Sequence, residues 1–431
     1  MSKRFGWWLG SAGLVSLALF VACGTTYKST TDGLVLVGSQ GSALLESFSF
    51  DLTNGHIAAV NNPPSSTGNS TCVLKGIPAS MVLDTAGAYA YTIIRSSDQC
   101  SGSATGIQAF KVNSDGTLTA AGNLASDPNP IALAMDTSGK FLFVAEGLGL
   151  MVPPATTPTP CIAGSTQYLV CTYAIGSGGA LTPVQNTYNL VPGTGFQPPN
   201  AVALAPTPTT IPTLVNGVQT AVCASPGNAA PTNEFLYAAD SVNNVVWEFV
   251  VNMSTGALSS PPNVGYFQAG STPSGVAVDP CDRFVYVSDL QSNQISGYRI
   301  CSVVSNASGC PAADGRLVAI SGSPFSQTLG LGPGPLLVDP FGKYVYVLET
   351  RSNQILPYTI SPVSGSITAG TVAVTGNLPI SMAIRGDDQW LFVTNFNTAT
   401  LSQYSIIPAT GALSELPAVQ TDNQPWGVAV K

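Results

Sequence analysis

The sequence predicts an all-β protein, a seven-bladed β-propeller with four antiparallel strands in each blade. Three observations lead to this fold class. A unit of four strands recurs along the chain, its first strand and its last turn each occur seven times, and the chain starts and stops in the middle of a unit. Four antiparallel strands with alternating apolar faces cannot bury both faces alone, whereas a ring of such sheets buries them against one another.

The repeating unit is clearest in the copies that begin at Pro273, Pro333 and Pro379. Each copy has a proline, a short apolar strand, a tight turn, a strand such as FVYV, a polar loop, a third strand, a glycine turn and a fourth strand. A proline lacks the N–H group and is typical of the first residue of a strand. The pairs Asp279-Pro280 and Asp339-Pro340 suit tight turns, so we expect a structural role for these aspartates rather than a catalytic one.

The two repeating features are out of phase along the chain. The unit starts at Pro78, Pro130, Pro199, Pro273, Pro333, Pro379 and Pro425, and its last turn contains Gly55, Gly116, Gly179, Gly256, Gly315, Gly365 and Gly411. The chain therefore opens with a second strand at residues 34–37 and closes with a first strand at residues 427–430. We expect the last strand to complete the first blade by pairing with residues 34–37, which closes the ring.

The N-terminus has the features of an export signal. Lys3 and Arg4 precede an uncharged apolar run at residues 7–22, which is shorter than the roughly 20 residues that span a membrane. The run ends at Cys23 and resembles a bacterial lipobox, although Phe20 stands where leucine is usual. We expect a lipoprotein signal peptide at 1–22, a lipidated Cys23 with a tether at 23–32, and a propeller at 33–431. The alternative is an ordinary signal peptide with an incidental Cys23.

Composition limits the partners of the exported chain. Charged residues make up 8% of the sequence, the net charge is −8, and no basic run contains interleaved aromatic residues. This pattern argues against a nucleic-acid partner. We expect a monomer in the bacterial cell envelope, on the periplasmic or surface side, that touches the membrane only through its lipid.

Eight cysteines remain after Cys23, and an even number in an exported protein indicates disulfides. Placing the cysteines on the blades favours the pairs Cys72–Cys100, Cys161–Cys171, Cys223–Cys281 and Cys301–Cys310, although spacing alone does not fix the connectivity. A metal cluster is the rival interpretation, but the chain lacks the CxxC spacing and the histidines that zinc sites usually show.

Two of the second strands carry a family signature. Residues 392–395 read FVTN, and Val287-Ser288-Asp289 follows Tyr286 in the same frame. The repeat over residues 34–431 resembles the YVTN/lactonase-like β-propeller family, which includes propeller-type 6-phosphogluconolactonases and carboxymuconate-cyclising enzymes. The resemblance implies the propeller fold. Because such repeats also build non-catalytic cell-surface proteins, function has to be argued from the site.

The residue that follows the second strand is the first candidate for a binding function. In chain order these positions hold Ser39, Ile94, Glu146, Asp240, Asp289, Glu349 and Asn395. Four consecutive blades thus supply a carboxylate close to the expected channel mouth. We expect this arc, with Arg351 and Asn395, to bind a polar ligand, and converging oxygens of Asp240, Asp289 and Glu349 would hold a divalent cation such as calcium. The alternative is that each carboxylate accepts hydrogen bonds from its own loop. Arg351 either pairs with Glu349 or reaches an anionic ligand.

The residues at the start of the inner strands are the second candidate. They are Ala79, Ile131, Asn200, Ser274, Gly334, Ile380 and Trp426, and most are small or apolar. They form either a structural plug or a pocket floor in which Trp426 offers a surface for stacking a sugar or lactone ring.

Histidine chemistry is excluded near the expected channel. His56 is the only histidine, and it follows Gly55 in a turn between the third and fourth strands. Nucleophile systems of the Ser-His-Asp and Cys-His kinds need a histidine beside the nucleophile. The histidine, arginines and glutamate that the resemblance implies for the carboxymuconate-cyclising branch do not map onto this sequence, so no catalytic residue is assigned.

Two functions remain open. The leading hypothesis is a binding module for a small polar ligand or an envelope protein. Binding would use the loop face, where the connections between blades and between second and third strands lie. The alternative is a sugar-lactone hydrolase that uses the acidic arc, with or without a divalent metal, because a lactone is an activated ester that carboxylate-assisted water attack can open. The scarcity of Lys and Arg argues against a phosphorylated substrate.

Overall fold

The computed structural model describes residues 32–41, 44–60, 77–95, 105–126, 130–146, 159–160, 170–186, 200–208, 234–261, 265–302, 310, 312–327 and 330–431. Within these ranges the chain is built of strands, and the single helical segment is the 3-10 turn η1 (Ser177–Gly179). None of the described helical structure is long and apolar enough to cross a membrane. The predicted signal peptide, Cys23 and most of the tether lie outside the described residues.

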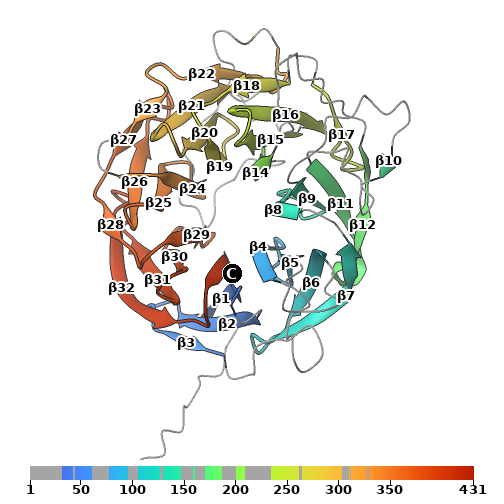
Figure 1. The fold of residues 1–431 in the computed structure, drawn as a ribbon, viewed down its shortest axis with the longest axis vertical. Helices are drawn as coiled ribbons and strands as arrows, with labels where there is room; N and C mark the ends of the chain where they lie inside the picture. Colours follow the sequence, from blue (N-terminus) through green and yellow to red (C-terminus); the bar gives the residue numbers. More distant parts are fainter. Residues whose placement is uncertain are drawn as a thin grey trace, which may run out of the picture.

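Seven antiparallel sheets stand around a common centre, as the repeat predicts (Figure 1). From the inner to the outer strand, blade 1 contains β33 (Pro425–Val430), β1 (Asp32–Ser39), β2 (Leu44–Asp51) and β3 (Ile57–Ala59). Blade 2 contains β4 (Ile77–Leu83), β5 (Tyr89–Arg95), β6 (Gly106–Val112) and β7 (Leu118–Ser126). Blade 3 contains β8 (Pro130–Met135), β9 (Phe141–Glu146), β11 (Val170–Ile175) and β12 (Leu181–Pro183).

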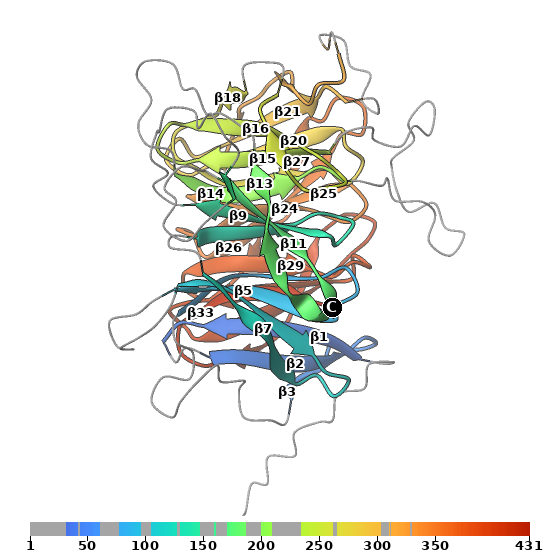
Figure 2. The same ribbon diagram turned by 90° about the vertical axis from the view of Figure 1, so that its right-hand side faces the viewer.

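The remaining blades follow the same order. Blade 4 contains β14 (Ala201–Pro206), β15 (Glu234–Asp240) and β16 (Val245–Val251), and blade 5 contains β19 (Pro273–Val278), β20 (Phe284–Asp289) and β21 (Gln294–Ile300). Blade 6 contains β24 (Pro333–Val338), β25 (Tyr344–Glu349) and β26 (Gln354–Ile360). Blade 7 contains β29 (Pro379–Ile384), β30 (Trp390–Asn395), β31 (Thr400–Ile406) and β32 (Leu413–Gln420). In the side view these sheets form one layered disc (Figure 2).

The outer edge differs from a plain four-stranded pattern in three blades. In blades 4 to 6 the fourth strand is split into two short pieces that both pair with the third strand. These pieces are β17 (Leu258–Ser259) with β18 (Tyr266–Gln268), β22 (Leu317–Ala319) with β23 (Phe325–Ser326), and β27 (Ile367–Ala369) with β28 (Ala373–Val374). A separate ribbon joins β10 (Thr159–Pro160) to β13 (Gln185–Asn186) beside blade 3.

The ring closes through the backbone of the two chain ends. Strand β33 pairs antiparallel with β1, with Val37 opposite Val428 and Leu36 opposite Ala429. Lys431 N donates to Leu34 O at 2.9 Å, which continues the ladder past the strand. The predicted pairing of the last strand with residues 34–37 is therefore confirmed, and Figure 1 places the C-terminus at the centre of the ring.

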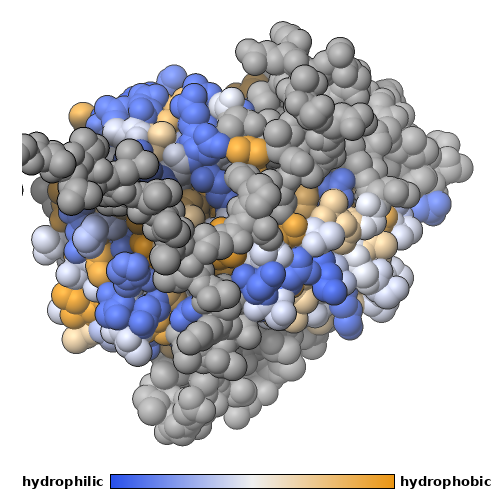
Figure 3. All heavy atoms as spheres, turned by 90° about the horizontal axis from the view of Figure 1, so that it is seen from below, coloured by the Kyte–Doolittle hydropathy of each residue, from blue (hydrophilic) through white to orange (hydrophobic). Residues whose placement is uncertain are grey.

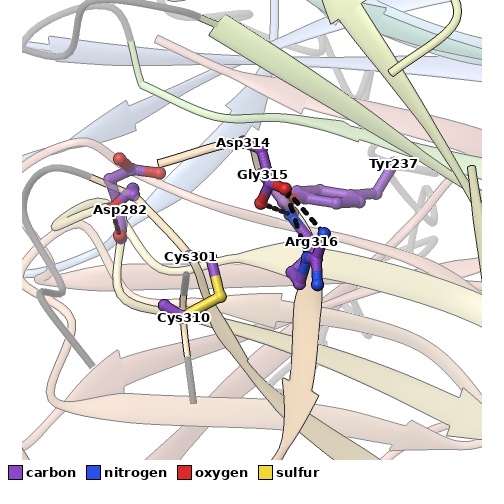
Figure 4. The surroundings of a disulfide bond; sticks show 8 residues. Tyr237, Asp282, Cys301, Cys310, Asp314, Gly315 and Arg316 are labelled. Atoms are coloured by element: carbon purple, nitrogen blue, oxygen red, sulfur yellow. Dashed lines mark hydrogen bonds and ion pairs between the residues drawn. A yellow bond between two sulfur atoms is a disulfide. The ribbon is translucent and has the colours of Figure 1, made fainter. Parts of the chain in front are cut away.

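Neighbouring blades are joined by a repeated contact between a tyrosine and a glycine turn. The hydroxyl of Tyr286 donates to Gly365 O in the next blade at 2.7 Å, and Tyr237 donates to Gly315 O at 2.5 Å (Figure 4). Gly365 has φ +76°, and a Cβ atom there would lie 2.6 Å from the Phe284 ring. The glycine that marks the last turn of each unit is therefore explained by a left-handed conformation and by close packing.

The Asp-Pro turns are held by their aspartates. Asp339 accepts backbone N–H bonds from Phe341, Lys343 and Tyr344 at 3.2, 2.6 and 2.6 Å. The same position in blade 4 is Thr207, whose hydroxyl accepts the Phe235 N–H at 2.8 Å. Asp339 thus caps its own turn, as expected for a structural role, and Thr207 bonds to the neighbouring strand β15.

One of the proposed disulfides lies within the described residues. Cys301, directly after β21, is bonded to Cys310 with a Cα–Cα distance of 5.3 Å (Figure 4). Cys171 and Cys281 are also disulfide-bonded. The other cysteines of the proposed pairs, Cys72, Cys100, Cys161 and Cys223, lie outside the described residues.

The exposed apolar residues are spread over the molecule. Val363, Val374 and Ile407 are 80%, 64% and 45% exposed on separate turns and edge strands. Seen from below, hydrophilic and apolar residues alternate on the coloured part of the surface (Figure 3).

Candidate functional site

The strand ends on the loop face have one geometry in all seven blades. In six blades the last residue of the second strand pairs with the first residue of the inner strand, as Asp289 does with Pro273 and Glu349 with Pro333. In blade 2 the ladder extends one residue further, to Arg95 and Ile77. The remaining pairs are Ser39–Pro425, Ile94–Pro78, Glu146–Pro130, Asp240–Ala201 and Asn395–Pro379. The seven positions that the sequence aligns, here called the strand-end residues, are therefore equivalent in space.

A β-bulge follows the inner-strand residue of each of these seven pairs. The register skips after Pro273, Pro379 and Pro130, which leaves Ser274, Ile380 and Ile131 without a partner in the ladder. Bulges re-aim side chains and are frequent beside active sites. Trp426 is the corresponding residue of blade 1, because Ser39 pairs with Pro425 and Gly38 with Gly427.

Blade 4 departs from the alignment made on the sequence. Ala201, not Pro199, pairs with the strand-end residue Asp240, and the bulge falls between Ala201 and Ala203. The inner-strand position assigned to Asn200 therefore belongs to Val202. The inner strand of blade 4 starts at Ala201 and not at a proline. Pro199, two residues earlier, therefore aligns in sequence with the prolines that start the other inner strands.

The inner strands carry no acid–base groups. Within the described residues, the seven inner strands read IPASMVL, PIALAM, AVALAP, PSGVAV, PGPLLV, PISMAI and PWGVAV, without a charged residue or a histidine. His56 is exposed in the turn between β2 and β3, at the outer part of blade 1. Acid–base chemistry near the centre of the loop face must come from the strand ends and the loops.

The strand-end residues are buried beneath the loops that connect the blades. Asp240, Asp289, Glu349 and Asn395 are 0% exposed, and Glu146 is 6% exposed. A glycine in the connecting loop lies directly on three of them, since a Cβ on Gly270, Gly330 or Gly376 would fall within 2.7 Å of the carboxyl or amide carbon. The carboxylates thus face their loops in this structure. No group of three His, Cys, Asp or Glu side chains comes together among the described residues, so the three oxygens proposed for calcium do not converge.

Most strand-end residues bond to the side chain seven positions later, on the third strand. Ser39 donates to Glu46 at 2.8 Å, and Asp289 accepts from Ser296 at 2.7 Å. Asn395 donates to Ser402 at 2.9 Å. This pairing fixes each strand-end side chain from within its own blade.

Asp240 is the most fully bonded of the carboxylates. One oxygen accepts the N–H groups of Asn200, Val242 and Asn243 at 3.0 to 3.2 Å. The other accepts the Asn243 amide at 2.7 Å and the Trp247 indole N–H at 2.9 Å. This geometry favours the alternative that Asp240 holds its own loop.

Glu349 breaks the pattern. The residue seven positions later is Leu356, which is 1% exposed and has no donor. Neither carboxyl oxygen of Glu349 has a hydrogen-bond partner among the described residues. Burial raises the pKa of Glu349 to about 7. Burial also raises the pKa of Asp289, to about 6, against the opposing effect of the Ser296 hydrogen bond.

Arg351 does not pair with Glu349 in this structure. It is exposed, and the ion pairs among the described residues join Arg283 to Asp279, Arg316 to Asp314 and Arg385 to Asp387. Of the two roles considered for Arg351, contact with an anionic ligand is the one that this geometry leaves open.

Trp426 is the exposed aromatic residue of the loop face. It is 36% exposed, and its ring meets Phe396 edge to face with centroids 5.6 Å apart. Phe396 N donates to Leu378 O at 2.9 Å, and Leu378 is 37% exposed. Sequence reasoning missed Phe396 and Leu378. The available signal was an aromatic residue directly after Asn395, where the other six blades carry Gln40, Arg95, Gly147, Ser241, Leu290 and Thr350.

Comparison with known proteins supports the predicted family. Residues 315–430 match the family model described as a lactonase, 7-bladed beta-propeller. The 6-phosphogluconolactonase of Yersinia pestis (strain Pestoides F) is 22% identical over 287 residues, which cover 65% of this chain and 81% of the relative.

Solved structures share the fold. The periplasmic gluconolactonase of Pseudomonas aeruginosa superposes with a TM-score of 0.63 at 16% identity, covering 93% of this chain and 99% of that one. A protein from Lactobacillus plantarum superposes with a TM-score of 0.64 at 17% identity, covering 93% and 99%. The resemblance to the lactonase-like β-propeller family that the repeat predicts is therefore confirmed.

Proposed function

We propose that this protein is an exported sugar-lactone hydrolase that acts on the loop face of its propeller. In this reaction water adds to the lactone carbonyl, the bond from the carbonyl carbon to the ring oxygen breaks, and the ring oxygen leaves as a hydroxyl group with a proton. The product is the open-chain hydroxy acid. The observation that carries the proposal is the family match over residues 315–430 on a closed seven-bladed ring.

The chemistry available on the loop face is carboxylate chemistry. Glu349 combines a pKa of about 7 with two oxygens that no described residue binds. A general base works best when its pKa lies near the working pH. Glu349 is therefore the strand-end carboxyl best suited to take a proton from water, provided that water reaches it past Gly330.

The N-terminal sequence supports export and lipid anchoring. A basic start, an apolar run at residues 7–22 and Cys23 have the order of a lipoprotein signal. A relative of the same fold is described as periplasmic. Export and anchoring at Cys23 are tested together by cell fractionation with a Cys23→Ser variant, which should leave the membrane fraction and stay in the soluble exported fraction.

A binding module without catalysis is the second candidate. It is favoured by the absence of charged residues and histidine from the seven described inner strands, and by the burial of the strand-end carboxylates. In this function the loop face would recognise a small polar ligand or an envelope protein and leave it unchanged.

Hydrolysis of a panel of sugar lactones by the purified protein separates the two functions. The panel contains glucono-1,5-lactone, its 6-phosphate and an alkyl lactone, each corrected for opening in the presence of heat-denatured protein. The hydrolase is supported if the rate of hydrolysis saturates with lactone concentration and if this rate is at least about tenfold lower in Glu349→Gln. Binding of lactones with no acceleration of their opening supports the binding module.

A further inference from the structure

Three uncharged segments meet where the last blade joins the first. They are residues 376–378 before β29, residues 395–397 after β30, and residues 423–426 at the start of β33. Asn397 N donates to Asn377 O at 3.2 Å, and the Asn397 side chain donates to the Asn377 side chain at 2.8 Å. Thr394 donates to Trp426 O at 2.8 Å, which ties blade 7 to the inner strand of blade 1.

We infer that Trp426, Phe396 and Leu378 form a platform on which an uncharged sugar ring stacks. The indole of Trp426 meets Phe396 at an interplanar angle of 85°. An edge-to-face contact covers at most one face of the indole, and Trp426 stays 36% exposed. An exposed aromatic face beside a polar rim suits a sugar, because the C–H groups of a pyranose or lactone ring pack on a π-surface.

The platform is specific to this seam of the ring. In the other blades the residues at the bulge include Ser274, Ile131, Val202 and Ile380, and none is aromatic. The bulge in β33 therefore presents the single aromatic residue among these inner-strand positions within the described chain.

The backbone beneath Leu378 is also specialised. Leu378 has φ +53°, in the left-handed region that residues with a Cβ avoid. The equivalent residues before the inner-strand proline are Thr272, Gly332 and Gln424, also with positive φ. Leu378 is the apolar residue of this set, and it is 37% exposed, so a strained position is used to present a hydrophobic side chain.

The surroundings favour a neutral ligand. The three segments contain no charged residue, and they carry the amides of Asn377, Asn397, Asn423 and Gln424. Amide side chains donate and accept hydrogen bonds, as sugar hydroxyls do, whereas a phosphate is best held by arginine or lysine. Asp422, which precedes the third segment, adds a negative charge that opposes a phosphate. The platform therefore fits an unphosphorylated sugar or sugar lactone.

The identity of the ligand as a lactone rests on the proposed function, whereas stacking of a neutral ring does not.

The test measures binding by calorimetry with gluconolactam, a ring analogue that does not open, and with glucose 6-phosphate as the charged probe. The variants are Trp426→Ala, Trp426→Phe and Leu378→Ala. Leu331→Ala is the matched control, because Leu331 is 60% exposed in the equivalent loop of blade 6. Thermal unfolding of each variant verifies that it is folded.

We expect Trp426→Ala to weaken gluconolactam binding about tenfold or more, Leu378→Ala to weaken it about threefold, and Trp426→Phe and Leu331→Ala to bind like the parent. Equal binding by Trp426→Ala, tighter binding of the phosphorylated probe, or no binding of either probe would overturn the platform. Trp426-dependent binding without lactone hydrolysis would refute the hydrolase and keep the platform. Hydrolysis with a KM that Trp426→Ala leaves unchanged would refute the platform and keep the hydrolase.

Discussion

Hydrogen bonds from the third strand hold several of the strand-end side chains, and the protonation of a strand-end carboxyl depends on its burial and on the donors beside it. Ser296 gives Asp289 a donor, whereas Leu356 gives Glu349 none. Because solvation is lost in both cases, both pKa values rise, to about 6 for Asp289 and about 7 for Glu349. Burial is the largest cause of both shifts, and hydrogen bonds from Ser296 and Gly270 oppose it at Asp289.

Glu349→Gln should remove a pH dependence of stability. Between its ordinary pKa of 4.5 and its folded value of about 7, the folded protein keeps a proton that the unfolded chain has lost. Stability should therefore fall as the pH rises through this window and level off above it. Urea unfolding from pH 4.5 to pH 8 should show that Glu349→Gln gains up to about 3 kcal/mol relative to the parent at high pH.

Two variants control this experiment. Glu415→Gln alters an exposed glutamate and should leave the pH profile unchanged. Leu356→Ser supplies the donor that blades 5 and 7 have, and should lower the pKa of Glu349. A stability difference between the parent and Glu349→Gln that is the same at both ends of the pH range would show that Glu349 titrates normally.

Asp240→Ala should destabilise the protein by about 3 kcal/mol or more, because it removes the buried acceptor of the Trp247 indole and of three backbone N–H groups. Asp240→Asn keeps one acceptor oxygen and should fall between the parent and Asp240→Ala. Chemical denaturation measures both. A cost below about 1 kcal/mol for Asp240→Ala would mean that the carboxylate is dispensable for the fold and would return it to the ligand-binding candidates.

At the scale of elements, the regular features of the blade were predictable and the irregular ones were not. Proline and glycine located most strand ends, because proline suits the start of a strand and glycine suits a left-handed turn. The misalignment at Asn200 arose where Ala201 replaces the proline. The burial of the strand-end carboxylates was not predictable, since it depends on loops folding back over them at Gly270, Gly330 and Gly376.

A turn glycine with positive φ should tolerate alanine better where no neighbouring blade lies against it, as at Gly178 beside the last-turn Gly179, than at the last-turn Gly365. Gly365 and Gly178 both have positive φ, but a Cβ meets the Phe284 ring at 2.6 Å in the first case and nothing within 4 Å in the second. Gly178→Ala should cost about 1 kcal/mol of backbone strain, and Gly365→Ala about 2 kcal/mol more. If Gly178→Ala and Gly365→Ala lower the urea midpoint of unfolding equally, contacts between blades do not explain why glycine recurs in the last turn.

At the scale of the whole molecule, stability depends on the pairing of the two chain ends. Strand β33 supplies the inner strand of blade 1, and Val428 is 5% exposed in the core shared with blade 7. Sequence alone indicated this closure, because the two partial units at the ends complete one another. The sequence indicated the ligand less strongly than it indicated ring closure. The reason is that the candidate site is assembled from loops of different blades, which lie far apart in the sequence.

Ala429→Pro should open the ring, because Ala429 pairs with Leu36 two residues along from the hydrogen-bonded pair of Leu34 and Lys431, so proline there removes an N–H that joins β33 to β1. We expect loss of cooperative thermal unfolding, read by circular dichroism. Val374→Pro is the control, as Val374 is 64% exposed on the outer strand β28, and it should lower the melting temperature by only a few degrees. A cooperative transition of unchanged midpoint in Ala429→Pro would show that ring closure does not stabilise the fold.

Lactone hydrolysis by the purified mature protein tests the central claim most directly. Proton release from glucono-1,5-lactone, followed at constant pH and corrected for spontaneous opening, should saturate with a turnover of about 10 s⁻¹. Trp426→Ala should raise KM, and Glu349→Gln should lower kcat. A release rate equal to that of heat-denatured protein at every lactone concentration would contradict the hydrolase and leave a propeller that binds without catalysis.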